Sequence, residues 1–140
     1  MNILDTYITE HFKFSEALFL KTWGIYVYPD TQDVWTNIQK TADVLELIRS
    51  IIGKPLHITS WYRPEKYNIV IGGAHSSMHV LGLAADFHCD GISCDEVRAI
   101  LLPHLHALDI RMEAGDAQNR VHIDLKRDVK LSNENRVFKP

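Results

Sequence analysis

The sequence contains little cysteine, no long apolar run and no excess of basic residues. Its 140 residues include only two cysteines, Cys89 and Cys94, which are too few for a disulfide framework. No apolar stretch approaches the roughly 20 residues that a membrane-spanning helix needs. A formal net charge of −3 provides no basic surface for nucleic acid. We therefore expect neither membrane insertion nor a nucleic-acid partner, and we interpret the cysteines as free thiols, with a bridge across a short loop as the alternative.

The first residues also lack the basic region and the apolar segment of a signal peptide. No repeat, linker or biased tract divides the chain, and its composition of 46% hydrophobic and 24% charged residues is that of a soluble globular protein. We predict a single domain over residues 1–140, synthesised as a soluble cytoplasmic protein and monomeric.

Apolar residues recur at helical spacing between Thr31 and Ile51, and Gly53-Lys54-Pro55 follows them, so this segment is predicted to be the longest helix. A shorter helix is expected after Ser15 as N-cap. Another is expected after the capping box that Ser93 and Glu96 form, with a kink at Pro103. Alternating or apolar segments predict strands at residues 56–60, 84–89, 108–113 and 120–125.

The remaining segments are interpreted as irregular. Residues 22–30 and the glycine-containing segment 68–74 are expected to be loops, and the polar last dozen residues are expected to lie on the surface or fray. Helices followed by strands mixed with a helix indicate the α+β class, with a small and mainly antiparallel sheet packed against helices.

Two of the predicted strands carry polar residues on one face only. In the segment 120–125, Val121 and Ile123 point to one side and His122 to the other, because side chains alternate along a strand. The segment 84–89 places Asp86 on its polar face in the same way. Alternation is ordinary for an antiparallel sheet with one solvated face. The presence of histidine and aspartate at these positions, rather than lysine or threonine, suggests a metal site.

A second histidine, His79, precedes Asp86 by seven positions. Two imidazoles and one carboxylate can bind zinc while leaving a fourth position for water, so we predict that His79, Asp86 and His122 converge on one catalytic zinc ion. Each residue alone is more often structural than metal-binding. His75 and His79, four residues apart, form an alternative pair, but the glutamate of an H-E-x-x-H motif is missing.

Three further residues are candidates for the chemistry around such a metal. Glu113 ends a strand that is expected to form a hairpin with the strand of His122, and it is our candidate general base, with Asp116 as the competing choice. Arg63 follows the first strand, and its planar guanidinium suits a substrate carboxylate or an oxyanion. Ser77 is a candidate hydrogen-bond donor to the same substrate.

These residues stand in an order that closely resembles the zinc D-Ala-D-Ala carboxypeptidases and L-alanyl-D-glutamate endopeptidases, whose fold also underlies the hedgehog signalling domain. The resemblance covers roughly Phe12 to Leu125. It rests on these pieces in succession: Tyr62-Arg63, Asn68, Gly72-Gly73-Ala74, Ser77-x-His79-x-x-Gly82-x-Ala84-x-Asp86 and Val121-His122-Ile123-Asp124.

The resemblance implies a hedgehog/DD-peptidase-like fold and a zinc-dependent peptidase. By position, His79, Asp86 and His122 would be the zinc ligands, and Arg63 would hold the substrate and steady the tetrahedral intermediate. An acid shortly before the late histidine would be the general base. The implied substrate is the stem peptide of peptidoglycan. A compact chain of this kind is similar to phage endolysins, which remain in the cytoplasm until lysis releases them to the cell wall.

The sequence departs from this family's pattern near the late histidine. Several branches have the base three residues before that histidine, where this chain has Asn119, while other branches have it at the end of the preceding strand, which matches Glu113. The aromatic residue often found before the Val-His pair is Arg120 here. These departures leave an alternative function open, a non-catalytic binding module that zinc stabilises.

Overall fold

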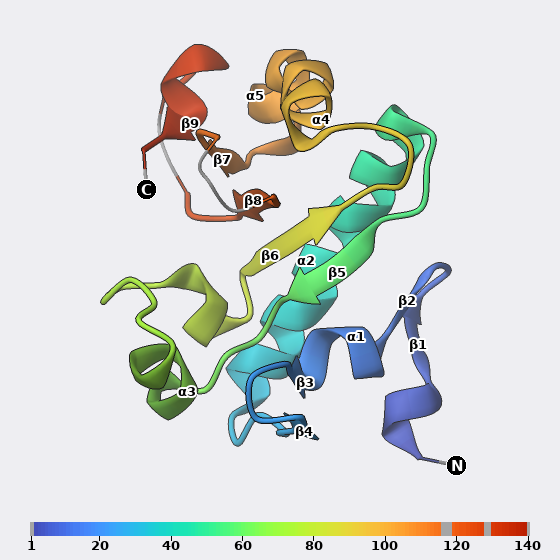
Figure 1. Cartoon of the computed structure of the whole chain (residues 1–140), viewed down its shortest axis with the longest axis vertical. Coiled ribbons are helices and arrows are strands. Elements are labelled where there is room, and N and C mark those ends of the chain that lie inside the picture. Colours follow the sequence, from blue (N-terminus) through green and yellow to red (C-terminus); the bar gives the residue numbers. More distant parts are fainter. Residues whose placement is uncertain (1, 116–118, 128–129, 140) are drawn as a thin grey trace.

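The computed structural model describes residues 2–115, 119–127 and 130–139 (Figure 1). Its helices are η1 (Ile3–Asp5), α1 (Phe14–Leu18), α2 (Gln32–Ile52), α3 (Glu65–Val70), η2 (Met78–Leu81), α4 (Cys94–Leu101), η3 (Leu102–His104), α5 (Leu105–Leu108) and η4 (Glu134–Arg136), with η marking 3₁₀ turns. Its strands are β1 (Tyr7–Thr9), β2 (Phe12–Lys13), β3 (Phe19–Leu20), β4 (Ile25–Tyr26), β5 (His57–Ser60), β6 (Ala84–His88), β7 (Arg111–Glu113), β8 (Val121–Asp124) and β9 (Val137–Phe138).

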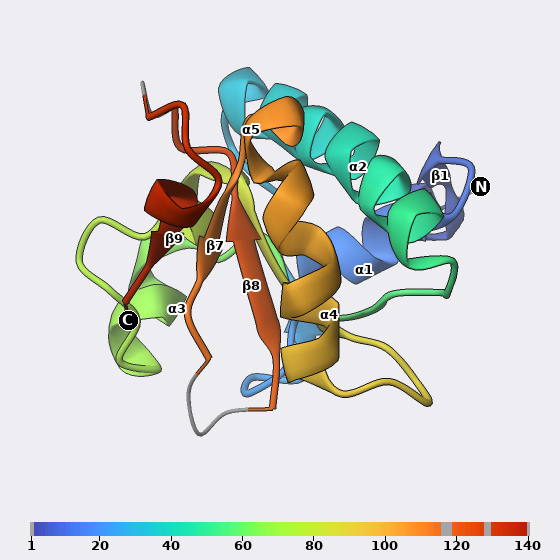
Figure 2. The ribbon, with the colours of Figure 1, turned by 90° about the horizontal axis from the view of Figure 1, so that it is seen from above.

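A five-stranded sheet in the order β5-β6-β8-β7-β9 forms the centre of the molecule. All its pairings are antiparallel except the parallel pair β7–β9. Helices α2 and α4 contact each other and cover one face of this sheet (Figure 2). The predicted α+β class with a mainly antiparallel sheet is therefore confirmed. The opposite face of the sheet carries the polar residues.

The core lies between the sheet and these helices. Burial of apolar surface contributes roughly 25 cal/mol per Å², so this layer dominates the stability of the fold. Its fully buried residues include members of α2, β6, α4 and β8, namely Ile38, Leu45, Ile48, Ala85, Phe87, Val97, Leu101, Val121 and Ile123. None of the helices in the described part of the chain combines the length and hydrophobicity needed to span a lipid bilayer.

Helix α2 confirms the prediction from spacing. It buries the apolar positions that recur every three or four residues, and it ends where Gly53 adopts a left-handed conformation with φ of 76°. Ser93 is confirmed as the N-cap of α4, since its Oγ accepts a hydrogen bond of 3.1 Å from the Glu96 N–H, while the Glu96 carboxylate accepts from the Ser93 hydroxyl at 3.2 Å. Pro103 lies in the 3₁₀ turn η3, which separates α4 from α5 as the predicted kink.

Helix α3 lies partly in the segment that was predicted to be a loop. The prediction failed because α3 has only six residues and leaves Ile69 and Val70 at 70% and 63% exposed, so it has no apolar stripe of helical period. Helix α1 begins at Phe14, one residue before the predicted N-cap Ser15. Lys13 is the N-cap of this helix, and its N–H donates a hydrogen bond of 3.0 Å to Glu16 Oε1 in the first turn.

Five short strands, β1, β2, β3, β4 and β9, were not predicted, and two of them lie in segments that were interpreted as irregular. Within residues 22–30, β4 pairs with β3 in a hairpin, and in the last dozen residues β9 pairs with β7 instead of fraying. The strand predicted at 108–113 is shorter than expected, because residues up to Leu108 are helical and β7 begins at Arg111. Cys89 and Cys94 are buried free thiols, as predicted.

Candidate metal centre

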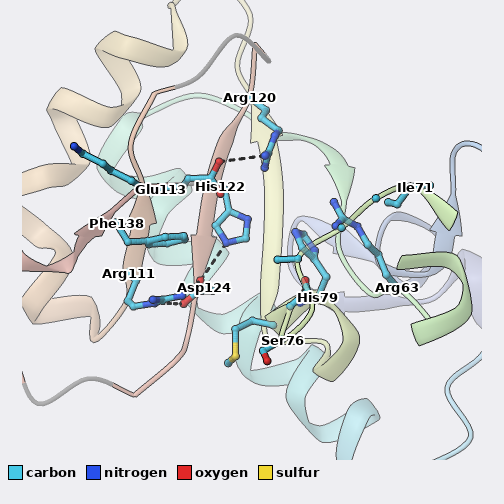
Figure 3. A pocket seen from close by; sticks show the side chains of 16 residues that line it. Arg63, Ile71, Ser76, His79, Arg111, Glu113, Arg120, His122, Asp124 and Phe138 are labelled. Carbon is cyan, nitrogen blue, oxygen red and sulfur yellow. Dashed lines mark hydrogen bonds and ion pairs between the residues drawn. The ribbon is translucent and has the colours of Figure 1, made fainter. Parts of the chain in front are cut away.

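The polar face of the sheet lines a cavity of about 540 Å³ (Figure 3). Its walls come from the segment between α3 and η2 on one side and from β7, β8 and β9 on the other. The side chains that bear on its chemistry are Arg63, His79, Glu113, Arg120, His122 and Phe138.

His79 lies on the turn η2, which the sequence positions closely. Ser77 caps this turn, because its Oγ accepts from the His79 N–H at 3.2 Å. Gly82 ends it with φ of 75°, where a Cβ would lie 3.1 Å from Ile38 and 3.2 Å from the Val34 carbonyl oxygen. The glycine of the motif is therefore required both by its conformation and by the close approach of η2 to α2.

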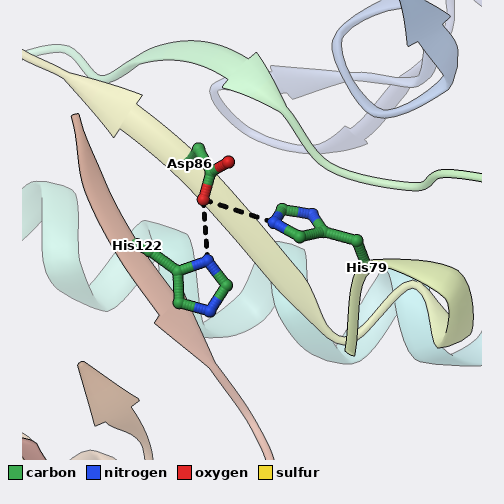
Figure 4. Close-up of side chains that lie close together, drawn as sticks. All are labelled: His79, Asp86 and His122. Carbon is green, nitrogen blue, oxygen red and sulfur yellow. Dashed lines mark hydrogen bonds and ion pairs between the residues drawn. The ribbon is translucent and has the colours of Figure 1, made fainter. Parts of the chain in front are cut away.

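Asp86 and His122 are direct partners in the β6–β8 ladder, so both side chains emerge on the same face of the sheet. Asp86 Oδ1 lies 2.7 Å from His122 Nδ1 and 3.3 Å from His79 Nε2 (Figure 4). One ligand atom from each of the three residues lies within 4.8 Å of the others. The structure thus brings together the predicted ligands, which are 2%, 2% and 8% exposed for His79, Asp86 and His122.

The environment of His79 fits a metal ligand. Its Nδ1 lies 2.6 Å from the Trp61 carbonyl oxygen, which can only accept, so Nδ1 carries the proton. Nε2 therefore carries a lone pair and faces Asp86 Oδ1 at 3.3 Å, and although it is buried it makes no hydrogen bond among the described residues. A buried acceptor without a partner is costly, whereas a metal ion at this position would satisfy it.

His122 is oriented by side chains instead. Its Nε2 lies 3.1 Å from Asp124 Oδ2, and Asp124 receives two hydrogen bonds from Arg111, at 2.9 and 2.8 Å. With the Nε2 proton donated to Asp124, Nδ1 is the nitrogen that faces Asp86 and the centre of the group. Metal-binding histidines commonly donate their second ring nitrogen to a carboxylate in this way.

Electrostatics distinguish the two histidines. Burial lowers the pKa of His79, although the charge of Asp86 opposes the shift. Burial would also lower the pKa of His122, but its hydrogen bonds to Asp124 and Asp86 raise that pKa to about 9. Burial would raise the pKa of Asp86, yet His79 and His122 hold it well below its usual value. The site therefore keeps Asp86 ionised and balances its charge with cations.

Two arginines contact Asp86 from the cavity. Arg63 Nη2 lies 3.1 Å from Asp86 Oδ2, and Arg120 Nη1 lies 3.0 Å from Asp86 Oδ1. Arg120 Nη2 also lies 3.2 Å from Glu113 Oε1 (Figure 3). The predicted residues Arg63 and Glu113 thus share one cavity with the three candidate ligands, and Arg120 connects Glu113 to Asp86.

Arg63 is held in place by α3 and the loop after it. Asn68, which is 3% exposed, accepts from Arg63 Nη1 at 3.3 Å and donates to the Ala74 carbonyl at 3.0 Å. Gly73 lies so close that a Cβ there would be 2.0 Å from Asn68 Oδ1. These contacts give Asn68 and Gly73 a role in holding the arginine.

The other predicted residues have these positions. Ser77 lines the cavity in addition to capping η2. Asp116, the competing candidate for the base, lies outside the described residues. His75 is exposed in a turn before η2 and shares no helix face with His79, so the alternative pair of histidines is not formed.

Sequence reasoning assigned no role to several residues of this site. Asp124 follows His122 by two positions on the same face of β8, so alternation gave a usable signal for it. Arg111 is the ladder partner of Asp124, which required knowledge of the strand register. Arg120 was noted only as a departure from a pattern, and nothing in the sequence pointed to Phe138.

The family comparison agrees with this geometry. The family model described as Peptidase M15 matches residues 12–124, which is most of the chain. The comparisons with curated proteins and with solved structures gave no significant match. The chain belongs to the Peptidase M15 family, whose members are in general zinc-dependent metallopeptidases.

Proposed function

We propose that this protein is a zinc peptidase that hydrolyses the stem peptides of peptidoglycan, as a D-Ala-D-Ala carboxypeptidase or an L-Ala-D-Glu endopeptidase. The observation that carries the proposal is the buried group His79, Asp86 and His122, in which His79 Nε2 is buried without a hydrogen-bond partner among the described residues. Membership of the metallopeptidase family and the adjoining cavity support a peptide substrate.

The proposed ligands are His79 Nε2, Asp86 Oδ1 and His122 Nδ1. Zinc held by two imidazoles and a carboxylate acts as a Lewis acid and lowers the pKa of water towards about 7. Trp61 and Asp124 fix the two imidazoles from behind, through the hydrogen bonds to His79 Nδ1 and His122 Nε2.

The remaining side chains of the cavity have complementary roles. Glu113 would accept a proton from the attacking water and return it to the leaving amine. Arg63 would stabilise the negative charge that develops on the substrate carbonyl oxygen, because its guanidinium lines the cavity beside the proposed ligand Asp86, 3.1 Å from Oδ2. Arg120, which lines the same cavity and lies 3.2 Å from Glu113 Oε1, would hold this carboxylate in place. Ser77 would donate a hydrogen bond to the bound peptide.

The base is tested by Glu113→Gln. This variant should bind zinc as the wild type does, but its hydrolysis of peptidoglycan should fall by about 10²- to 10⁴-fold, because the amide cannot accept the proton. Glu10→Gln is a matched control, since the Glu10 side chain is 84% exposed. Unchanged hydrolysis by Glu113→Gln would transfer the role of base to Asp116.

Catalysis itself is tested by a zymogram on peptidoglycan with and without a chelator. A cleared zone that disappears with chelator and returns with added zinc is expected. A wild-type protein that binds zinc and clears no zone would instead favour the non-catalytic binding module.

The cleaved bond is identified by mass spectrometry of digested muropeptides. Loss of a terminal D-alanine would assign a carboxypeptidase, while cleavage between L-alanine and D-glutamate would assign an endopeptidase. Lysis of cells when the protein is added from outside would support an endolysin that lysis releases to the cell wall.

A further inference from the structure

The strand β9 completes the cavity, although it lies outside the residues 12–124 that the family model matches. It runs parallel to β7, with Glu113 and Phe138 as ladder partners, and the Ala114 N–H donates to the Phe138 carbonyl at 2.7 Å. In Figure 2 this strand lies at the edge of the sheet, beside β7 and away from α2.

A buried arginine anchors the segment that carries β9. Arg136 is 3% exposed, and its Nη1 lies 3.1 Å from Asp109 Oδ1. Its Nε donates to the Lys130 carbonyl at 3.0 Å. Burying a guanidinium is costly unless it is paired and hydrogen-bonded, so these contacts fix the position of β9 against the sheet.

The anchor places the Phe138 ring against two members of the metal centre. The ring lies edge-on to the His122 imidazole, with centroids 5.7 Å apart and an interplanar angle of 84°. The Arg111 guanidinium carbon lies 4.0 Å from the centroid of the same ring. In Figure 3 the Phe138 ring covers Arg111 and borders His122.

These contacts matter because Arg111 and His122 are the two ends of one chain of hydrogen bonds through Asp124. A ring over the guanidinium adds a cation–π attraction and excludes water from the Arg111–Asp124 pair. Electrostatic interactions are stronger where water is excluded. The ring also packs edge-on against the His122 imidazole itself, so it contacts the proposed ligand directly.

We propose that Phe138 is a positioning residue for the metal centre. It holds His122 in its metal-binding orientation, both by direct contact and through Arg111 and Asp124. This inference rests on the proposed zinc site but not on the identity of the substrate. The segment after the family-matched region thus belongs to the functional site.

Zinc affinity, measured by competition with a chromophoric chelator, tests the proposal without any substrate. Phe138→Ala should weaken zinc binding by about 3- to 10-fold, less than the roughly 10- to 100-fold typical of losing a direct hydrogen-bond partner of a ligand. Phe138→Tyr keeps the ring, so its zinc affinity should stay within about twofold of that of the wild type, as for a substitution that disturbs no contact of the site. The visible spectrum of the cobalt-substituted Phe138→Ala variant should also change.

Two variants separate positioning from stability. Val137→Ala, which alters the neighbouring residue that packs towards the core, should lower the melting temperature and leave zinc affinity unchanged. Leu131→Ala removes a side chain that is 75% exposed and should change neither.

Equal zinc affinity and equal cobalt spectra for the wild type and Phe138→Ala would overturn the proposal, and so would a loss in Phe138→Ala no larger than that in Val137→Ala. A wild type that binds no zinc would instead overturn the proposed function, so the two failures are distinguishable.

Discussion

The two histidines of the candidate metal centre are held by different means. His79 lies on a turn and is fixed by main-chain atoms, the Trp61 carbonyl behind it and the capped backbone of η2 around it. His122 lies on a strand and is fixed by the side chains of Asp124, Arg111 and Phe138. The same result, a buried imidazole that points at Asp86, is reached through backbone geometry on one side and through charge on the other.

The difference determines where the centre is sensitive to mutation. No single substitution removes the carbonyl that orients His79, whereas one substitution at Asp124 removes the acceptor that orients His122. It also determines charge, because the pKa of His79 is lowered by burial and that of His122 is raised to about 9. The His122 side should therefore respond more strongly to mutation and to pH.

The largest effect on zinc binding is expected from removing any of the three proposed ligands themselves. His79→Ala, Asp86→Ala and His122→Ala should each lose zinc on dialysis, because each removes one of three proposed ligands. Metal analysis of each purified variant beside the wild type provides the measurement. His104→Ala, an exposed histidine of η3, is the control and should retain metal. Equal metal content in all these proteins would contradict the ligand assignment.

Asp124→Asn should have the next largest effect. The variant keeps the size of the side chain but weakens its hydrogen bond to His122 and its two bonds to Arg111. We expect zinc affinity to fall by about 10- to 100-fold, as for other partners behind metal-binding histidines. Chelator competition measures the loss. A zinc affinity equal to that of the wild type would contradict the proposal that side chains hold His122 in place.

The affinity for zinc should rise with pH. The raised pKa of His122, about 9, means that in the metal-free protein this imidazole is protonated at neutral pH, and zinc must displace the proton from Nδ1. Between pH 6.5 and 8 the affinity should rise by about tenfold per pH unit, as expected for release of one proton. Calorimetry in buffers of different ionisation enthalpy counts that proton, and binding without proton release would contradict the assignment.

The smallest effect is expected on the His79 side. Asn37 on α2 donates to the Leu81 carbonyl of η2 at 2.9 Å, so Asn37→Ala removes a contact to the turn without touching the imidazole. The free energy of unfolding should fall by about 1 kcal/mol, typical of one hydrogen bond. Zinc affinity should stay unchanged, because Trp61 continues to orient the ring. Denaturant unfolding and chelator competition together check both parts, and a tenfold loss of affinity would erase the contrast between the sides.

The sequence allowed prediction of those parts of the site that depend on local pattern. Alternation placed His122 and Asp86 on the polar faces of their strands, and the helical spacing of α2 placed the core. Contacts between distant segments were not predictable in this way. Arg111 meets Asp124 through the strand register, and Phe138 meets His122 only because β9 returns to the edge of the sheet. Short elements such as α3 also escaped, since six residues carry too little periodicity.

The close packing of Gly73 against Asn68 has a consequence for changing the selectivity of this cavity. Even a methyl group at position 73 would overlap the amide that steadies Arg63, so any larger residue would displace that guanidinium. Ile71 and Ser76 border the same cavity on either side of this point. Combinatorial libraries intended to redirect the enzyme to new peptides should therefore vary Ile71 and Ser76 while leaving the glycine between them invariant.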